Sequence, residues 1–73
     1  MEVRTLWEWR HERGITRRQL AELVGLDVAR LSDIEALVVR GRKFVWHRIA
    51  KVLNIEPEQI YEYRLLFLDE PKL

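Results

Sequence analysis

The sequence predicts a compact all-α domain built from five helices. Apolar residues recur every three or four positions in successive blocks, which is the spacing of one face of a helix. The chain has no sustained alternation of apolar and polar residues and no Asn-Gly hairpin dipeptide. With 73 residues and no cysteine it has room for one small domain without a disulfide. We therefore expect self-association to supplement a thin stability margin.

The first predicted helix spans about residues 2–13. One face of it collects Val3, Leu6, Trp7 and Arg10, with Trp9 on the flank. Gly14 follows, and glycine adopts the left-handed conformation that ends helices at little cost. We therefore expect this helix to end at Gly14.

A second helix is predicted to open at Thr16, which has capping-box spacing with Gln19. Its expected buried stripe is Leu20, Leu23 and Val24. Gly25 supplies a tight turn, and Asp27 is a good N-cap for a third helix. These residues predict the arrangement helix, glycine turn, helix.

The third helix is predicted to pack on the core through Leu31, Ile34 and Val38. The residues expected on or near its open side are Val28, Ala29, Arg30, Ser32 and Asp33.

A fourth helix is predicted from about Phe44 to Leu53, with Asn54 as its stop. Its candidate core residues are Val45, Trp46, Ile49, Val52 and Leu53. Pro57 suits the first turn of a fifth helix. Ile60 and Tyr61 are expected to dock that fifth helix on the core.

After Arg64, the run Leu65-Leu66-Phe67-Leu68 is apolar on every side, and Pro71 is expected to end regular structure. We therefore divide the chain into a helical domain over 1–64 and an apolar tail over 65–73. A contiguous apolar patch usually marks an interface, which predicts a homodimer held by this tail. The alternative is that the tail folds back over the first and fifth helices of the same subunit.

The formal net charge of +1 is unevenly distributed. It divides into +1 over residues 1–26, −2 over 27–37, +5 over 38–51 and −3 over 52–73. The basic stretch holds Arg40, Arg42, Lys43, Arg48 and Lys51. A local basic patch is the footprint of phosphate contacts. Taken alone, the charge fits a solvated helix face equally well.

An ordered set of short segments resembles the phage repressor and Cro family (XRE-type) of helix-turn-helix proteins over about residues 3 to 63. The segments are Trp9-Arg10, Gly14-Ile15-Thr16, Gln19-Leu20-Ala21-Glu22, Val24-Gly25-Leu26, Leu31-Ser32, Ile34-Glu35, Arg48-Ile49-Ala50-Lys51-Val52-Leu53, Ile55 and Pro57. The resemblance implies a lambda-repressor-like fold that places its third helix in the major groove, usually as a dimer on a palindromic operator.

The chain departs from the family at three places. Arg17 stands where the family often has Gln, and it keeps a phosphate contact at a helix N-terminus while adding charge. Leu37 stands where a glycine often ends the third helix, so we expect this helix to run on over about 28–39, with Gly41 as its stop. The base-reading positions hold Val28, Ala29 and Asp33 in place of long polar side chains.

These observations predict a DNA-binding transcriptional regulator, with double-stranded DNA as its partner. The expected contact residues are Arg17, Arg18, Asp27, Val28, Ala29, Arg30, Ser32, Asp33, Arg40, Arg42 and Lys43. The alternative is a protein-interaction module on the same fold, antitoxin-like or adapter-like, that binds a protein partner through Val28, Ala29 and the apolar tail.

Arg10 and Glu35 are expected to form a structural ion pair, because matching residues commonly pair across the first and third helices of the family that the chain resembles. His11 and His47 are expected at the surface, although His47 adjoins Arg48 and a phosphate contact is the other interpretation. The helical spacing of Trp7, Trp9 and Trp46 favours core packing over base stacking.

Enzymatic function is not expected. The hydroxyl side chains besides the tyrosines are Thr5, Thr16 and Ser32, and no spacing brings them together with a histidine as a catalytic triad or a metal site needs. No cofactor is expected. Because no apolar run has the length of a signal-peptide core or a membrane span, we expect a cytoplasmic protein.

Overall fold

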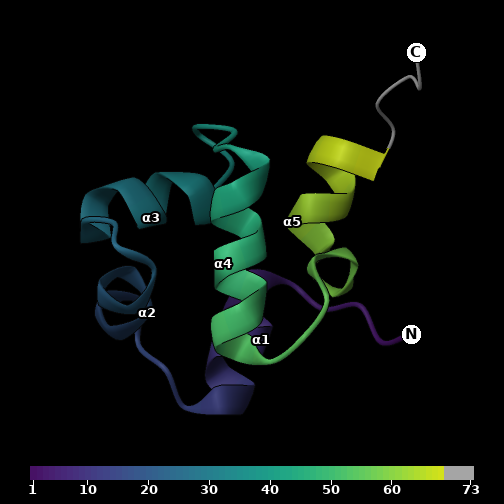
Figure 1. Ribbon diagram of the computed structural model, residues 1–73, viewed down its shortest axis with the longest axis horizontal. Coiled ribbons are helices and arrows are strands. Elements are labelled where there is room, and N and C mark those ends of the chain that lie inside the picture. The colour runs from purple at the N-terminus through teal and green to yellow at the C-terminus, as the bar shows by residue number, and fades with distance from the viewer. Residues whose placement is uncertain (69–73) are drawn as a thin grey trace.

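The computed structural model describes residues 1–68, and helices account for most of them (Figure 1). The helical segments are α1 (Leu6–Arg13), α2 (Arg17–Val24), α3 (Val28–Glu35), α4 (Lys43–Leu53), the 3-10 turn η1 (Pro57–Gln59), α5 (Tyr61–Tyr63) and the π-helical turn η2 (Arg64–Leu68). Within these residues, extended pairing is limited to one parallel bridge between Arg4 and Ile60. The prediction of an all-α domain is confirmed.

The longest helix, α4, forms the centre of the molecule. Figure 1 shows α4 upright between the α2–α3 pair on one side and α5 on the other, with α1 behind it. Trp46, Ile49 and Leu53 on its inner face are completely buried. The core they share consists of Leu6, Trp9, Leu20, Ala21, Val24, Leu31, Ile34, Trp46, Ile49, Ala50, Leu53, Ile60, Tyr63 and Phe67. No helix within residues 1–68 has the length and apolar character needed to cross a bilayer.

The helix ends in the middle of the chain lie where the sequence places them. The Thr16 hydroxyl accepts from the Gln19 backbone amide at 3.1 Å, and the Gln19 side chain accepts from the Thr16 amide at 2.9 Å. Gly25 is left-handed, with φ 81°. The Asp27 carboxylate accepts from the Arg30 backbone amide at 2.9 Å and so caps α3.

The first helix begins later than the predicted residue 2. Thr5 caps α1, while Arg4 is extended and pairs with the segment around Ile60: the Arg4 amide donates to the Gln59 carbonyl at 3.0 Å. This start turns Trp9 inward, where its indole N–H donates to the Gln59 carbonyl at 2.8 Å. Trp9 is 4% exposed, whereas Trp7 is 50% exposed, so the prediction of core packing is wrong for Trp7. Val3 lies before the helix and not on its face.

The third helix ends at Glu35, so the prediction that it continues to about residue 39 is wrong. Leu37 itself adopts the left-handed conformation, with φ 62°, and turns the chain out of the helix. The backbone amides of Val38 and Val39 then fold back onto the Asp33 carbonyl, at 2.8 and 3.3 Å. Val38 consequently projects outward and is 71% exposed, where the sequence predicts a buried residue.

Two further predictions of burial are corrected. Leu23 is exposed on α2, and the small Ala21 faces the core in its place because α2 and α4 pack closely there. The predicted fifth helix is divided into η1, α5 and η2, and this division turns Tyr61 outward and Tyr63 inward. In the tail, Phe67 is buried, while Leu65 and Leu68 are 49% and 44% exposed. The stop predicted at Pro71 lies outside the described residues.

Candidate nucleic-acid interface

The exposed face of α3 is fixed by the residues on its opposite face. Leu31 and Ile34 are fully buried against the core, which turns Val28, Ala29 and Asp33 outward. Arg30 is exposed as well. These are the side chains that the sequence predicts as base contacts.

Ser32 is less exposed than these residues. It is half-buried and lines a shallow pocket together with Trp7, Arg17 and Glu35. This position is near the open side of α3, as the sequence predicts.

A buried ion pair fixes α3 against α1. The Arg10 guanidinium donates to both oxygens of Glu35, from Nε at 3.1 Å and from Nη2 at 2.9 Å. The two side chains are 6% and 9% exposed. Arg10 also donates to the Ile15 carbonyl at 3.3 Å, so its contacts join α1 both to α3 and to the loop before α2. This bidentate geometry orients the helices as well as balancing charge.

The first turn of α2 presents two exposed arginines, Arg17 and Arg18. The Arg17 Nε lies 3.6 Å from a Glu35 oxygen, so the same carboxylate that binds Arg10 also orients Arg17. The unpaired backbone amides of a helix N-terminus attract anions, and a neighbouring guanidinium adds to that attraction.

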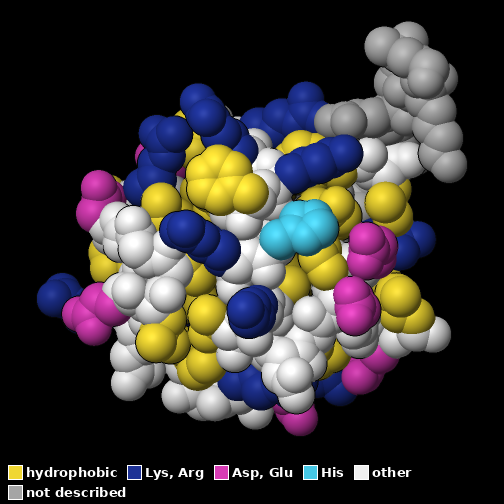
Figure 2. All heavy atoms as spheres, viewed as in Figure 1, with side chains coloured by type: hydrophobic (Ala, Val, Ile, Leu, Met, Phe, Trp, Pro, Cys, Tyr) yellow, Lys and Arg dark blue, Asp and Glu magenta, His cyan; other side chains and the backbone are white. Residues whose placement is uncertain are grey.

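A second group of cations follows α3, in the residues we call the basic segment: Arg40, Arg42 and Lys43. Arg42 is the extended residue that precedes α4, and Lys43 is the first residue of the helix. The Trp46 indole donates to the Arg40 carbonyl at 3.1 Å and so holds the backbone of the segment on the core. Figure 2 shows Lys and Arg side chains gathered over the upper part of this view, where α4 begins in Figure 1.

Glycine is required inside the basic segment. Gly41 has φ 73°, and a Cβ built there would lie 3.3 Å from the Trp46 indole nitrogen and 3.4 Å from Ile34. A side chain at this position would therefore be strained and crowded, and it would displace the segment from the core.

Phe67 of η2 contacts two members of the basic segment, and the sequence gives no sign of this. The Arg40 guanidinium carbon lies 4.8 Å from the centroid of the Phe67 ring, and Lys43 Nζ lies 5.6 Å from it. Arg40 also donates to the Leu66 carbonyl at 2.8 Å. The residues are more than twenty positions apart in the chain, beyond the reach of helical periodicity.

The remaining cations of α4 have a different environment. Arg48 donates to the Val24 carbonyl at 3.3 Å, which caps the C-terminal end of α2, and its guanidinium lies 5.7 Å from the Phe44 ring. His47 is exposed, with its ring edge-on to Tyr63 at 5.8 Å. Arg48, one of the five cations of the basic stretch, therefore makes a structural contact within the domain.

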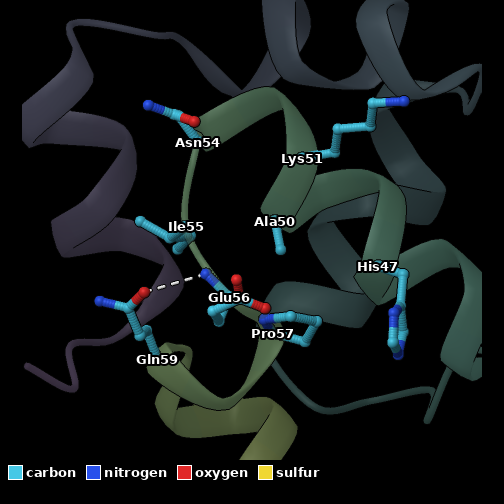
Figure 3. Close-up of a pocket in the computed structure, with 8 residues that line it drawn as sticks. All are labelled: His47, Ala50, Lys51, Asn54, Ile55, Glu56, Pro57 and Gln59. Atoms are coloured by element: carbon cyan, nitrogen blue, oxygen red, sulfur yellow. Dashed lines mark hydrogen bonds between the residues drawn. The ribbon is translucent and has the colours of Figure 1, made fainter. Parts of the chain in front are cut away.

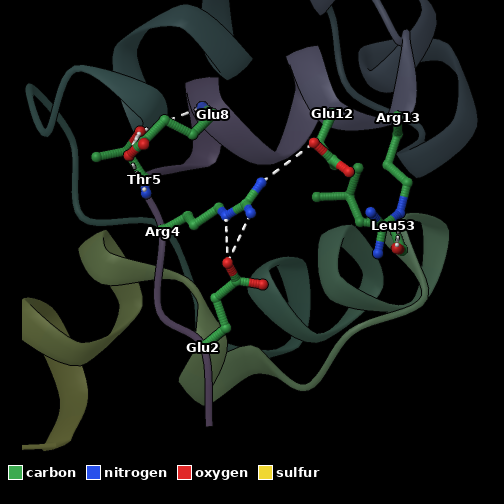
Figure 4. A network of polar contacts seen from close by, with 7 residues as sticks. All are labelled: Glu2, Arg4, Thr5, Glu8, Glu12, Arg13 and Leu53. Carbon is green, nitrogen blue, oxygen red and sulfur yellow. Dashed lines mark hydrogen bonds and ion pairs between the residues drawn. The ribbon is translucent and has the colours of Figure 1, made fainter.

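The polar network around α1 also uses its cations within the domain (Figure 4). Arg4 pairs with Glu12 at 3.2 Å and with Glu2, and Arg13 donates to the Leu53 carbonyl at 2.9 Å. The amide of Thr5 donates to Glu8, which holds the pKa of that carboxyl below its usual range. We therefore place the candidate interface on α3 and its flanks, away from this network.

Glu62 is a buried carboxylate that the sequence does not single out. Its Oε1 accepts from the Leu6 amide at 2.9 Å, at the N-terminal end of α1. Burial raises the pKa of Glu62, and the Leu6 hydrogen bond offsets part of that rise. Its contact with α1 is a structural one between α5 and the first helix.

A hollow lies between α4 and η1 (Figure 3). It measures about 390 Å³ and is lined in part by His47, Lys51 and Glu56. The nearby Gln59 side chain is engaged with the Glu56 backbone amide at 2.9 Å. Across residues 1–68, no three His, Cys, Asp or Glu side chains are grouped to hold a metal ion.

The α2–Gly25–α3 unit, with α3 facing outward and α4 behind it, defines a helix-turn-helix domain. Comparison with family models agrees, since the model described as "Helix-turn-helix domain" matches residues 3–62. The chain therefore belongs to the helix-turn-helix domain family, a result consistent with the resemblance to phage repressors and Cro. This family is typically non-enzymatic. No curated protein and no solved structure matches the chain.

Proposed function

We propose that this protein is a cytoplasmic DNA-binding transcriptional regulator that inserts α3 into the major groove of double-stranded DNA as a homodimer. The observation that carries the proposal is the outward face of α3 together with two groups of exposed cations: Arg17 and Arg18 in the first turn of α2, and the basic segment that follows α3. A recognition helix accompanied by phosphate-binding groups matches how helix-turn-helix proteins bind a duplex.

Phosphate contacts supply most of the affinity in this proposal. The outer face of α3 offers Val28 and Ala29, which can contact thymine methyl groups, and Asp33, which can accept from a cytosine amino group. Arg30 is the long donor on this face, and Asp27 is occupied as the N-cap. With few bidentate base contacts, we expect weak discrimination among sequences and strong dependence on salt.

The proposal is tested by removing one positive charge at a time. Arg42→Ala should weaken binding to every duplex and reduce the slope of log K against log salt by about one unit, because one phosphate contact is lost. The matched control is Lys51→Ala, which removes an exposed cation from the far half of α4. Fluorescence polarisation with a random 20-base-pair duplex over a KCl series compares them. Equal effects of the two substitutions would contradict the proposed interface.

A protein-interaction module is the second candidate, favoured by the net charge of −2 over residues 27–37 and by the exposed Val28 on α3. In that case the outer face of α3 would bind a protein rather than a duplex. The same polarisation assay separates the two functions, because a protein-binding module would leave the duplex unbound even at low salt.

A further inference from the structure

Phe67 lies where the C-terminal segment meets the phosphate-binding side of the molecule. It is 7% exposed, and its ring centroid is 5.0 Å from that of Tyr63. Figure 1 shows η2 at the level of the first turns of α4, where the basic segment leads into the helix. The ring thus contacts the core on one side and two cations on the other.

The contacts of Arg40 with this segment are of two kinds. Its guanidinium lies 4.8 Å from the Phe67 centroid, within the range of an attractive cation–π contact. It also donates to the Leu66 carbonyl at 2.8 Å. Together a ring and a carbonyl limit both the position and the rotation of a side chain that is otherwise rich in rotamers.

These contacts are compatible with phosphate binding. An arginine contacts a ring through the face of its guanidinium, whereas the five N–H donors at the edge can be shared between a carbonyl such as that of Leu66 and a phosphate. Lys43, with Nζ 5.6 Å from the same centroid, is held by the same ring. Ordering both side chains before DNA arrives lowers the entropy lost when each meets its phosphate.

We propose that Phe67 is a positioning residue for DNA binding: its ring holds Arg40 and Lys43 in place for the phosphate backbone. The inference rests on the proposed function and extends it, because it makes the C-terminal segment a determinant of DNA affinity. A change that lifts η2 from α4, such as association of the tail with another protein, would then weaken binding without any change in α3.

Phe67→Leu tests the role of the ring separately from burial, since leucine keeps an apolar side chain at the site but has no π face. In the full chain we expect Phe67→Leu to bind a random 20-base-pair duplex about two- to fivefold more weakly at fixed KCl. The salt slope should remain that of the wild type, because no charge is removed. Tyr61→Leu, which removes an exposed aromatic ring from the neighbouring helix, is the matched control and should bind as the wild type does.

A double-mutant cycle assigns the effect to the cations. In an Arg40→Ala/Lys43→Ala background, the further change Phe67→Leu should leave the affinity unaltered, because nothing remains for the ring to position. An equal loss in both backgrounds, or no loss in either, would overturn the role of Phe67. Thermal melts of all variants exclude unfolding as the cause.

An NMR measurement without DNA examines the contact itself. The Nε–Hε resonance of Arg40 should carry a ring-current shift and restricted motion in the wild type, and Phe67→Leu should abolish both. If Phe67→Leu loses both the ring-current shift and the restricted motion but binds duplex as tightly as the wild type, the positioning role of Phe67 is overturned while the proposed DNA binding stands. If the wild type binds no duplex at low salt, the proposed function fails, and the positioning role fails with it.

Discussion

At the scale of single residues, the domain depends on charges placed inside it. Arg10 and Glu35 meet in bidentate geometry, and Glu35 also orients Arg17. Because Arg17 is one of the proposed phosphate contacts, the same carboxylate serves the fold and the interface. Within residues 1–68, every buried side-chain nitrogen or oxygen has a hydrogen-bond partner.

Removing one member of this pair should harm the fold more than removing both. Glu35→Leu removes the carboxylate partner of the buried Arg10, and Arg10→Met leaves the buried Glu35 with only its 3.6 Å contact to Arg17. Removing one partner of a buried ion pair costs roughly 3 to 5 kcal/mol of the free energy of unfolding. The double variant replaces the pair with apolar side chains and should recover much of that loss. Urea denaturation of the three variants measures the coupling; strictly additive losses would show that Arg10 and Glu35 act independently.

Glu62 should make stability depend on pH in the mildly acidic range. Its pKa is raised in the fold by burial, so the folded state holds the proton more tightly than the unfolded chain does. The free energy of unfolding therefore falls as pH rises from about 4.5, the ordinary value for glutamate, through the raised pKa of Glu62. Above that pH the penalty is complete.

Glu62→Gln should flatten this pH dependence, since the amide keeps an oxygen for the Leu6 N–H but does not titrate. At neutral pH the variant should be at least as stable as the wild type. Melts at a series of pH values above 4.5 measure the effect, with the exposed Glu22→Gln as control. A variant that keeps the wild-type pH profile would contradict this account of Glu62.

At the scale of helices and turns, the sequence predicts a helix end correctly where a single contact between one side chain and one backbone group determines it. The capping residues Thr16 and Asp27 and the stops at Gly14, Gly25 and Asn54 follow from short-range chemistry. The end of α3 could not be predicted in this way, because Leu37 adopts the left-handed conformation, which is sterically unfavourable for a residue with a Cβ.

Leu37→Gly should relieve that strain. The left-handed conformation costs a residue with a Cβ about 1 to 2 kcal/mol. Glycine removes this strain, but its greater conformational freedom in the unfolded chain offsets part of the stabilisation. We expect a net stabilisation of about 0.5 to 1 kcal/mol, seen as a higher Tm. Val38→Gly, at the exposed neighbouring position, lacks this strain and should not stabilise; equal effects of the two changes would refute the explanation.

Some features of the candidate site were also predicted from local sequence, and others were not. The sequence predicted the exposed cations of α2 and the basic segment, and the outward positions of α3, because each depends on helical periodicity and local charge. It could not predict that Phe67 lies against Arg40 and Lys43, or that Glu62 reaches the start of α1. Those contacts join residues far apart in the chain, and only the packing of the whole domain sets them.

At the scale of the molecule, the homodimer held by the tail remains a prediction. Phe67 is buried within the subunit, so among the described residues of the tail the exposed Leu65 and Leu68 are the ones that we expect to form the contact. The double variant Leu65→Glu/Leu68→Glu should be monomeric at micromolar concentration while the wild type is dimeric, as sedimentation velocity can measure. A monomeric wild type would refute the prediction.

The proposed function requires that the exposed cations of α2 and of the basic segment bind the DNA backbone. The most direct measurement is the affinity of the wild-type protein for a random duplex over a KCl series. Five phosphate contacts from Arg17, Arg18 and the basic segment predict a slope of log K against log salt of about −4.5 for one domain, and twice that for a dimer. A slope near zero, or no binding at low salt, would contradict the account.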